Sequence, residues 1–440
     1  MNDNLDRLPE EPLDRFTMPF MRFMYLQTTA GAFLLFCTLF ALVLSNSSWS
    51  TSFLAFWETQ ASFRIGAIEF SRSLKFWIND GLMTLFFFLV ALELKRAVTL
   101  GEMRNPRMVA LPIAAALGGM IVPAGIFLFL EGSGPGAHGW GTVMATDTAF
   151  VIGCLALLGS RIPHSLRLFL LSISVFDDIG AILVVAIASV DTLNWAALGL
   201  AGLGLTVVAA ITHLGIRNML IYLAVGVSIW FALDASGIHP TLAGVMLGLM
   251  TSTRSWVSDT RLHAILDRLV AYPPGDHWSD DSIYMEDLHR ANVATIEVLS
   301  PVERFEILLH PWVIFTVMPL FALANAGVPI SLADINGAVA LAIFVALVVG
   351  KPIGVILFSY FALNLGLAMR PFELSWNMLV AGSLLTGIGF TMALFIAELA
   401  FVTDLLNSAK LAILGASGVS AICGLLALAW LTSSRRRGPE

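Results

Sequence analysis

Two adjacent aspartates, Asp177 and Asp178, stand in the middle of an apolar stretch that runs over residues 166–190. Even on a gentle insertion scale, each charged Asp at mid-membrane costs roughly 2.5–3.5 kcal/mol. The free energy of unfolding of a typical protein is only about 5–15 kcal/mol. A pair this costly is most simply explained as a site that handles protons or cations.

One basic residue, Lys351, lies inside another apolar stretch, residues 337–361. The aspartate pair lies about 11 residues, or roughly 17 Å, into its stretch, and Lys351 about 14 residues, or roughly 21 Å, into its own. We therefore expect all three near mid-membrane, with Lys351 as the partner of one aspartate. Two acids and one base leave one acid uncompensated, and carboxylate oxygens suit hard monovalent cations as well as protons. The three residues predict a site where protons and a cation compete.

A third carboxylate, Asp147, follows Thr146 in an apolar run that looks broken, as does the run around residues 386–392. Gly weakens helix interiors, and Thr and Asp side chains can serve backbone groups that lose helical partners. Irregular backbone at membrane depth is tolerated only where it lines a cavity or is buried in protein. We expect Asp147 to offset the positive N-terminal ends of half-helices and Lys351 the negative C-terminal ends. Thr146 either ligates the cation or satisfies the backbone.

The whole chain has the composition of a polytopic membrane protein. Its 440 residues are 58% hydrophobic and only 12% charged, whereas about 25% of residues are charged in average proteins. The mean hydropathy is +0.84. We expect about twelve spans of a hydrocarbon core roughly 30 Å thick. The apolar runs lie near 27–45, 76–94, 108–130, 143–158, 166–190, 196–212, 218–233, 239–252, 311–325, 337–361, 377–399 and 409–432.

The basic residues predict the orientation of these spans. With a cytoplasmic N-terminus and alternating spans, nineteen Lys and Arg residues fall inside and four fall outside, as the positive-inside rule requires. The bias supports twelve spans, because the loss of one would reverse every later loop. We accordingly expect a cytoplasmic segment 1–26, a single transmembrane domain 27–432 and a basic cytoplasmic tail 433–440.

The predicted fold is all-α, with inverted repeats. Spans three to five and ten to twelve can be laid over each other at an offset of seven spans, and because seven is odd the second unit runs in the opposite direction. The broken spans four and eleven then occupy corresponding places, an arrangement typical of secondary transporters whose site lies where discontinuous helices meet. The sequence has no GxxxxGK[ST] nucleotide-binding loop, so an ion gradient is the expected energy source.

Two connecting stretches are long enough to hold structure of their own. Residues 253–308, assigned to the cytoplasm, predict a solvated connector with an amphipathic helix or two, or alternatively a regulatory element. Residues 46–75 form an outer loop that could hold a short hairpin or an interfacial helix. The three cysteines all fall in apolar runs and are expected to be core residues rather than disulfides. We expect no resident cofactor and no nucleic-acid partner.

Eight different short motifs follow one another over most of the chain, from about Asn79 to Ala412. They are 145–150 (ATDTAF), 155–163 (LALLGSRIP), 176–182 (FDDIGAI), 239–245 (HPTLAGV), 309–312 (LHPW), 319–327 (PLFALANAG), 350–354 (GKPIG) and 387–392 (GIGFTM). Together these motifs resemble the NhaA-type Na+/H+ antiporters. Each motif is weak alone, but the ordered set is very specific.

The resemblance implies crossed, interrupted fourth and eleventh helices among twelve. It implies an antiporter that exchanges Na+ or Li+ for protons, electrogenically and with activation at alkaline pH. By family motif, Asp178 and Asp177 would bind the cation and carry protons. Thr146 and Asp147 would support the site, with Thr146 as a possible ligand, and Lys351 would pair with Asp177.

The resemblance also implies a setting and a regulation. Glu93, His239 and Glu306 match positions linked to the pH response. The protein is expected to lie in the bacterial inner membrane with both termini cytoplasmic, surrounded by lipid. It is expected to form homodimers, helped by the outer loop after the first span.

Three features depart from the family pattern. The stretch 253–308 is longer and more acidic than the usual loop, Ala97 stands where a Glu is expected, and Glu398 stands where a small polar residue is more usual. The motifs of the ion site are intact. The departures therefore concern regulation more than the ion site.

Three alternatives remain, one of them another transporter and two of other classes. A symporter of organic or bile-acid-like anions could share the crossed-helix architecture, but the acidic pair favours cations. An intramembrane aspartyl protease needs two aspartates on separate helices, whereas Asp177 and Asp178 are adjacent. A channel is less consistent with a lysine beside the acidic pair. We therefore expect a transporter and not an enzyme.

Overall fold

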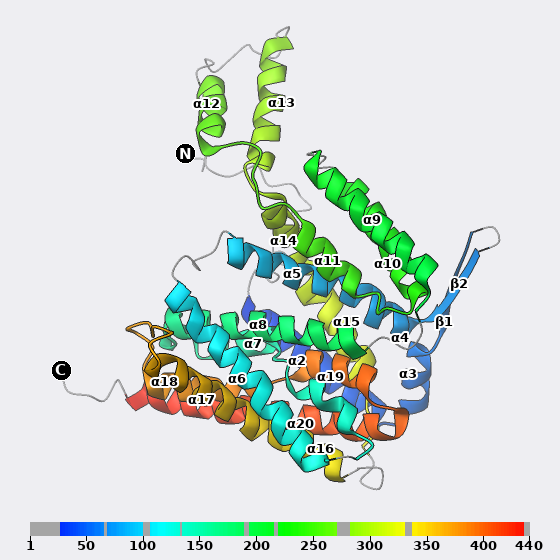
Figure 1. The fold of residues 1–440 in the computed structure, drawn as a ribbon, viewed down its shortest axis with the longest axis vertical. Helices are drawn as coiled ribbons and strands as arrows, with labels where there is room; N and C mark the ends of the chain where they lie inside the picture. The colour runs from blue at the N-terminus through cyan, green and yellow to red at the C-terminus, as the bar shows by residue number, and fades with distance from the viewer. Residues whose placement is uncertain are drawn as a thin grey trace, which may run out of the picture. The chain divides into compact units, whose positions relative to one another are not determined.

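The computed structural model describes residues 27–65, 68–99, 106–132, 134–188, 193–214, 219–270, 282–330 and 337–434. Over these residues the protein is mostly helical (Figure 1). The predicted cytoplasmic segment 1–26 and residues 435–440 of the predicted tail lie outside the described residues. The chain divides into two compact units.

The first unit comprises the described parts of 1–83, 105–190 and 311–440. Its helices and strands are α2 (Gln27–Ser45), α3 (Ser50–Trp57), β1 (Gln60–Ile65), β2 (Ile68–Ser73), α4 (Leu74–Phe76), η1 (Trp77–Leu82), α6 (Pro106–Glu131), η2 (Ala137–Val143), α7 (Thr148–Leu157), η3 (Gly159–Arg161), α8 (His164–Ala188), η4 (Val313–Val317), α15 (Met318–Asn325), α16 (Gly337–Val345), η6 (Ala346–Gly350), α17 (Lys351–Asn364), α18 (Trp376–Ser383), η7 (Leu384–Gly387), α19 (Phe390–Ala400) and α20 (Thr403–Ser434). Three of them, η1, η4 and η6, are π-helical turns within longer helices.

Two helical spans of the first unit are interrupted, where the sequence predicts breaks. The 3-10 helix η2 ends at Val143, and α7 begins only at Thr148. In the second span η7 ends at Gly387 and α19 begins at Phe390, with a bend of 42° between the two parts. Both breaks leave backbone amides and carbonyls without helical partners, so polar side chains are needed there.

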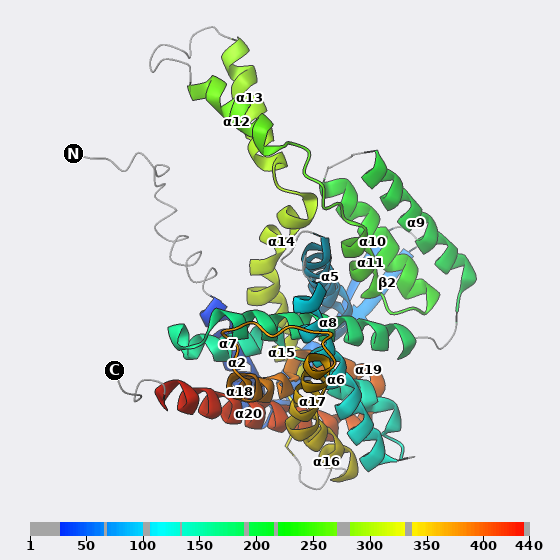
Figure 2. The ribbon, with the colours of Figure 1, turned by 60° about the vertical axis from the view of Figure 1, so that its left-hand side comes forward.

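The helices of the first unit pack closely where small residues meet. Helices α6 and α17 lie side by side in both views (Figures 1 and 2). A Cβ atom built on Gly118 would lie 2.1 Å from the carbonyl oxygen of Gly354. Only glycine permits this approach, because the two backbones are in contact at that point.

The predicted outer loop 46–75 contains both structures that its sequence allows, a short helix and a hairpin. Helix α3 is followed by the antiparallel strands β1 and β2, which pair from Gln60↔Ser73 to Ile65↔Ile68. The hairpin departs from the all-α prediction. Its reason is local, since β1 (QASFRI) alternates polar and apolar residues throughout and β2 (IEFSRS) over its first four residues, which is the period of a strand.

The second unit comprises the described parts of 84–104 and 191–310. Its helices are α5 (Met83–Thr99), α9 (Trp195–His213), α10 (Met219–Ser236), α11 (Leu242–Met250), α12 (Asp259–Val270), α13 (Ser282–Glu297) and α14 (Pro301–Trp312). Helices α9 and α10 form one pair, and α12 and α13 another (Figures 1 and 2). The second pair lies in the stretch 253–308, where one or two amphipathic helices are predicted.

Helix α14 begins ten residues before the apolar run predicted from position 311. Its start is fixed by a capping box at Ser300 and Glu303. The Ser300 amide and hydroxyl donate to Glu303 Oε2 at 2.8 and 2.7 Å, and the Glu303 amide donates to Ser300 Oγ at 3.4 Å. Such a box stabilises a helix start even where the first turns are polar.

Among the described residues, six helices are long and apolar enough to cross a membrane, or eight if each of two bent pairs is counted as one span. The bent pairs are Ala30–Ser45 with Ser50–Trp57, and Trp376–Gly387 with Phe390–Ala400. Several apolar helices are thus present. The number twelve and the crossing of the interrupted helices stay predictions.

Candidate cation site

A buried ion pair joins Asp177 of α8 to Lys351, the first residue of α17. Asp177 Oδ2 and Lys351 Nζ lie 3.2 Å apart, and both side chains are fully buried. Lys351 Nζ also donates to the carbonyl oxygen of Met144 at 2.6 Å. The structure thus brings Lys351 to one aspartate. It also brings Lys351 to the C-terminal end of η2, the first half of the interrupted helix, where the helix dipole is negative, as predicted.

Thr146 completes the surroundings of Asp177. Its hydroxyl lies 2.5 Å from Asp177 Oδ2 and 3.2 Å from the carbonyl oxygen of Thr386. Asp177 Oδ2 therefore has two donors beside it. Asp177 Oδ1 is also buried and has no hydrogen-bond partner among the described residues. A buried carboxylate oxygen needs compensation, so Oδ1 is a position where a proton or a cation can bind.

Asp178 is the second acid of the site. Its side chain is 3% exposed, and its charge acts on Lys351. Because adjacent residues of a helix point about 100° apart, Asp177 and Asp178 project from α8 in different directions. Two carboxylates and one ammonium give the site a formal charge of −1 when all three are ionised.

Asp147 occupies the place where the two interrupted helices meet. Its Oδ1 accepts from the Phe150 amide at 3.0 Å as the N-cap of α7. Its Oδ2 accepts from the Thr391 amide at 3.0 Å and from the Thr391 hydroxyl at 2.6 Å. Its own amide donates to the Ile388 carbonyl at 2.7 Å. As predicted, one carboxylate serves the positive ends of both half-helices, and both of its oxygens are engaged.

Two polar residues near the acids escaped the sequence analysis. Thr391 lies in the motif 387–392, and its bonds to Asp147 have no signal in the sequence. Ser174 lies on α8, is 1% exposed and has a hydroxyl without a hydrogen-bond partner among the described residues. It precedes Asp178 by four residues, a spacing that places both on one face of a helix. This spacing could have identified it.

The three residues that are expected to take part in a pH response all lie in the second unit. Arg96 Nε forms an ion pair with Glu306 Oε2 at 2.9 Å, and Glu93 is close enough to interact electrostatically with both. His239 Nδ1 lies 2.8 Å from the hydroxyl of Thr241, just before α11. The structure therefore brings Glu93 and Glu306 together around Arg96, and it places His239 against Thr241.

A family model described as Na+/H+ antiporter 1 matches residues 21–428. The chain is 64% identical over 437 residues to the Na+/H+ antiporter NhaA of Rhizobium meliloti, covering 99% of this chain and 100% of that protein. The chain belongs to the NhaA family of Na+/H+ antiporters. The resemblance predicted from the motifs is thereby confirmed.

Other NhaA relatives match over similar lengths. One is the Na+/H+ antiporter NhaA 2 of Acidiphilium cryptum, 56% identical over 97% of this chain and 95% of its own length. Another is NhaA 2 of Vibrio vulnificus, 51% identical over 99% and 97%. The solved structure of the sodium proton antiporter MjNhaP1 from Methanocaldococcus jannaschii aligns over 95% of this chain and 98% of its own, with 13% identity and a TM-score of 0.48. Family membership and the apolar helices together indicate a multi-pass membrane protein.

Proposed function

We propose that this NhaA-family member is a secondary antiporter that extrudes Na+ or Li+ in exchange for protons. The observation that carries the proposal is the buried ion pair of Asp177 and Lys351 beside Asp178, with the open oxygen Asp177 Oδ1. Relatives that share 64% and 56% of their residues with this chain bear the name Na+/H+ antiporter.

Cation binding follows from the charges. The cation enters a site with a formal charge of −1, and carboxylate and hydroxyl oxygens are ligands that suit it. Asp178, Asp177 Oδ1 and the Thr146 hydroxyl supply such oxygens. A bound cation draws charge away from Asp177 and loosens its contact with Lys351, whose ammonium keeps the Met144 carbonyl as a partner.

Proton binding follows from the same groups. When the cation leaves, protons take its place on the carboxylates, so either ligand excludes the other. Electrogenic exchange requires more than one proton for each cation, and two adjacent carboxylates offer more than one position. At acidic pH protons occupy these oxygens and block the cation, so activity rises toward alkaline pH.

We place this activity in the bacterial inner membrane. The proposal includes twelve spans with both termini cytoplasmic, interrupted helices that cross, and a transmembrane domain over residues 27–432. It includes homodimers in which the hairpin β1–β2 contributes to pairing. Glu93, Glu306 and His239 would adjust the pH at which transport begins.

No observation favours the symport of organic anions, because the open groups of the site are carboxylate oxygens that repel anions. If the site binds a cation, Asp178 must supply a charged oxygen ligand. A carboxamide at this position cannot supply a charged ligand.

The test uses inside-out vesicles from a host that lacks its own Na+/H+ antiporters. Respiration acidifies the vesicles, Na+ or Li+ is added, and a fluorescent weak base reports the pH gradient over a series of pH values. Native protein is expected to dissipate the gradient, more strongly at alkaline pH, whereas Asp178→Asn at equal abundance is expected to have no effect. If neither cation moves protons at any pH with well-expressed native protein, the proposal is wrong.

A further inference from the structure

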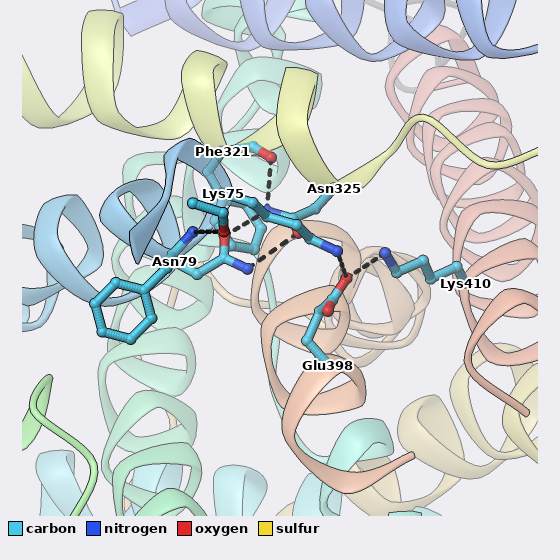
Figure 3. A network of polar contacts seen from close by, with 8 residues as sticks. Lys75, Asn79, Phe321, Asn325, Glu398 and Lys410 are labelled. Atoms are coloured by element: carbon cyan, nitrogen blue, oxygen red, sulfur yellow. Dashed lines mark hydrogen bonds and ion pairs between the residues drawn. The ribbon is translucent and has the colours of Figure 1, made fainter. Parts of the chain in front are cut away.

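A second charged cluster lies at the end of α19 that is remote from the cation site (Figure 3). Glu398 of α19 pairs with Lys75 of α4, with Oε1 and Nζ 3.0 Å apart, and with Lys410 of α20. We call these three residues the Glu398 cluster. The side chain of Glu398 is 14% exposed and that of Lys410 6% exposed, against 24% for Lys75. Both ion pairs are thus largely shielded from water, and ion pairs that are exposed to water are the weakest.

The Glu398 cluster is one corner of a closed ring of contacts. Asn79 of η1 and Asn325 of α15 exchange side-chain hydrogen bonds of 3.2 and 2.7 Å. The rings of Phe321 on α15 and Phe395 on α19 contact each other, with centroids 6.2 Å apart. Lys75 then closes the ring from α19 back to the segment α4–η1 (Figure 3). Three elements that are distant in the sequence therefore fix one another.

Helix α19 connects this ring to the cation site. Thr391, whose amide and hydroxyl donate to Asp147, lies in its first turn. Glu398 follows seven residues later, about 10 Å along the axis and close to the same face of the helix. A short helix held at both ends transmits any shift of one end to the other.

We propose that Glu398 is a positioning residue for the cation site. Clamped between Lys75 and Lys410, it fixes α19 along its axis and so sets the contact between Thr391 and Asp147, next to Thr146 and Asp177. Lysines near the last turn of α19 also match the negative end of its dipole. The inference rests on the proposed function and adds a residue at which this chain departs from the usual family pattern.

The electrostatics of the Glu398 cluster predict which substitution is worst. Glu398→Gln leaves two ammonium groups facing one neutral amide, and like charges repel. Adding Lys75→Gln removes one of these ammonium groups and restores the native formal charge of +1. The double variant is therefore expected to be less impaired than Glu398→Gln alone, which simple loss of packing does not predict.

The experiment measures the Na+ dependence of thermal unfolding of the purified full-length protein in detergent. Choline chloride keeps the ionic strength constant. A ligand that binds only the folded state stabilises it by RT ln(1 + [L]/Kd), so a fit of stabilisation against Na+ concentration gives the apparent Kd for Na+ without turnover. Glu398→Gln is expected to raise this apparent Kd about fivefold, the lower end of the usual range for coupling between remote groups, and Lys75→Gln/Glu398→Gln to recover part of the loss.

Glu297→Gln is the matched control. Glu297 Oε1 pairs with Arg304 Nη1 at 2.8 Å, and its side chain has the same exposure of 14%, but it lies in α13 of the second unit. It is expected to lower the unfolding temperature without changing the apparent Kd for Na+. If Glu398→Gln behaves in the same way, Glu398 is only a structural ion pair and the inference is overturned.

Two further outcomes are decisive. If Glu398→Gln cannot be purified, Lys75→Gln alone replaces it, and an unchanged apparent Kd for Na+ in that variant overturns the inference. If Na+ stabilises neither the native protein nor any variant, the proposed function fails and the inference fails with it. This outcome can be told apart from a failure of the inference alone, because in it the native protein also lacks stabilisation by Na+.

Discussion

Replacing Asp147 by Ala is expected to destabilise the protein more than any other single change at the junction of the broken helices. Ala removes the N-cap of α7, a loss of about 1 kcal/mol. It also leaves the buried amide and hydroxyl of Thr391 without their acceptor, at about 1–3 kcal/mol for each group. The expected loss in the free energy of unfolding is therefore about 3–7 kcal/mol, a large part of the stability of an ordinary protein.

Asp147→Asn separates the hydrogen bonds from the charge. The amide oxygen can still accept one bond, and the amide nitrogen can donate to the hydroxyl of Thr391, so the expected loss is roughly 1–3 kcal/mol. Because both oxygens of Asp147 are engaged by the helix ends and neither is a proposed ligand, the purified Asn variant should keep stabilisation by Na+, with an affinity weakened only as far as its contact with Thr391 is altered. Asp178→Asn, which removes a proposed ligand, should lose this stabilisation.

The assay is denaturant unfolding in mixed micelles, followed by tryptophan fluorescence, for native protein, Asp147→Asn and Asp147→Ala. The order of stability should be native, Asn, Ala. If the Ala variant unfolds within about 0.5 kcal/mol of the native protein, a range typical of neutral surface substitutions, the assignment of Asp147 to the helix ends is refuted.

Three further predictions concern the same unit. Thr146→Val removes the hydroxyl beside Asp177 and should raise the Na+ concentration needed for half-maximal exchange in vesicles, while an unchanged value would exclude it as a ligand. Lys351→Gln leaves Asp177 as a buried charge without its partner and should lower the free energy of unfolding by about 3–5 kcal/mol at alkaline pH, with a smaller loss at acidic pH, where the aspartate takes up a proton. Gly118→Ala places a Cβ against the carbonyl of Gly354 and should lower the free energy of unfolding by about 1–3 kcal/mol through overpacking. Gly125→Ala should be tolerated, because nothing lies within 4 Å of a Cβ at that position.

Much of the helical framework could be predicted because hydrocarbon makes polar residues conspicuous. A charge inside an apolar run has few explanations, so Asp177, Asp178 and Lys351 were visible before any contact was known. The breaks before Thr148 and before Phe390 were visible for a related reason, since Gly, Thr and Asp cluster where a helix loses its own hydrogen bonds.

The contacts between distant segments could not be predicted in the same way. Depth along a helix puts Lys351 level with both aspartates but does not select Asp177, a choice that came from the family motif. The bonds from Thr391 to Asp147 and from Asn79 to Asn325 join residues more than two hundred positions apart, and no local pattern encodes such pairs. The capping box at Ser300, by contrast, was readable and would have given the start of α14.

The π-helical turn η6 ends at Gly350, and the amide of Lys351 donates to the carbonyl of Ala346, five residues back. Such a turn holds one residue more than an α-helical turn and often occurs at functional sites. One extra residue changes the angular register of everything that follows by about 100°. The insertion or deletion of one residue before Lys351 in this helix is thus enough to rotate the Lys351 ammonium group toward or away from Asp177. In this chain, an insertion or deletion within α16 or η6 is therefore expected to be as consequential as a substitution of the charged residues themselves.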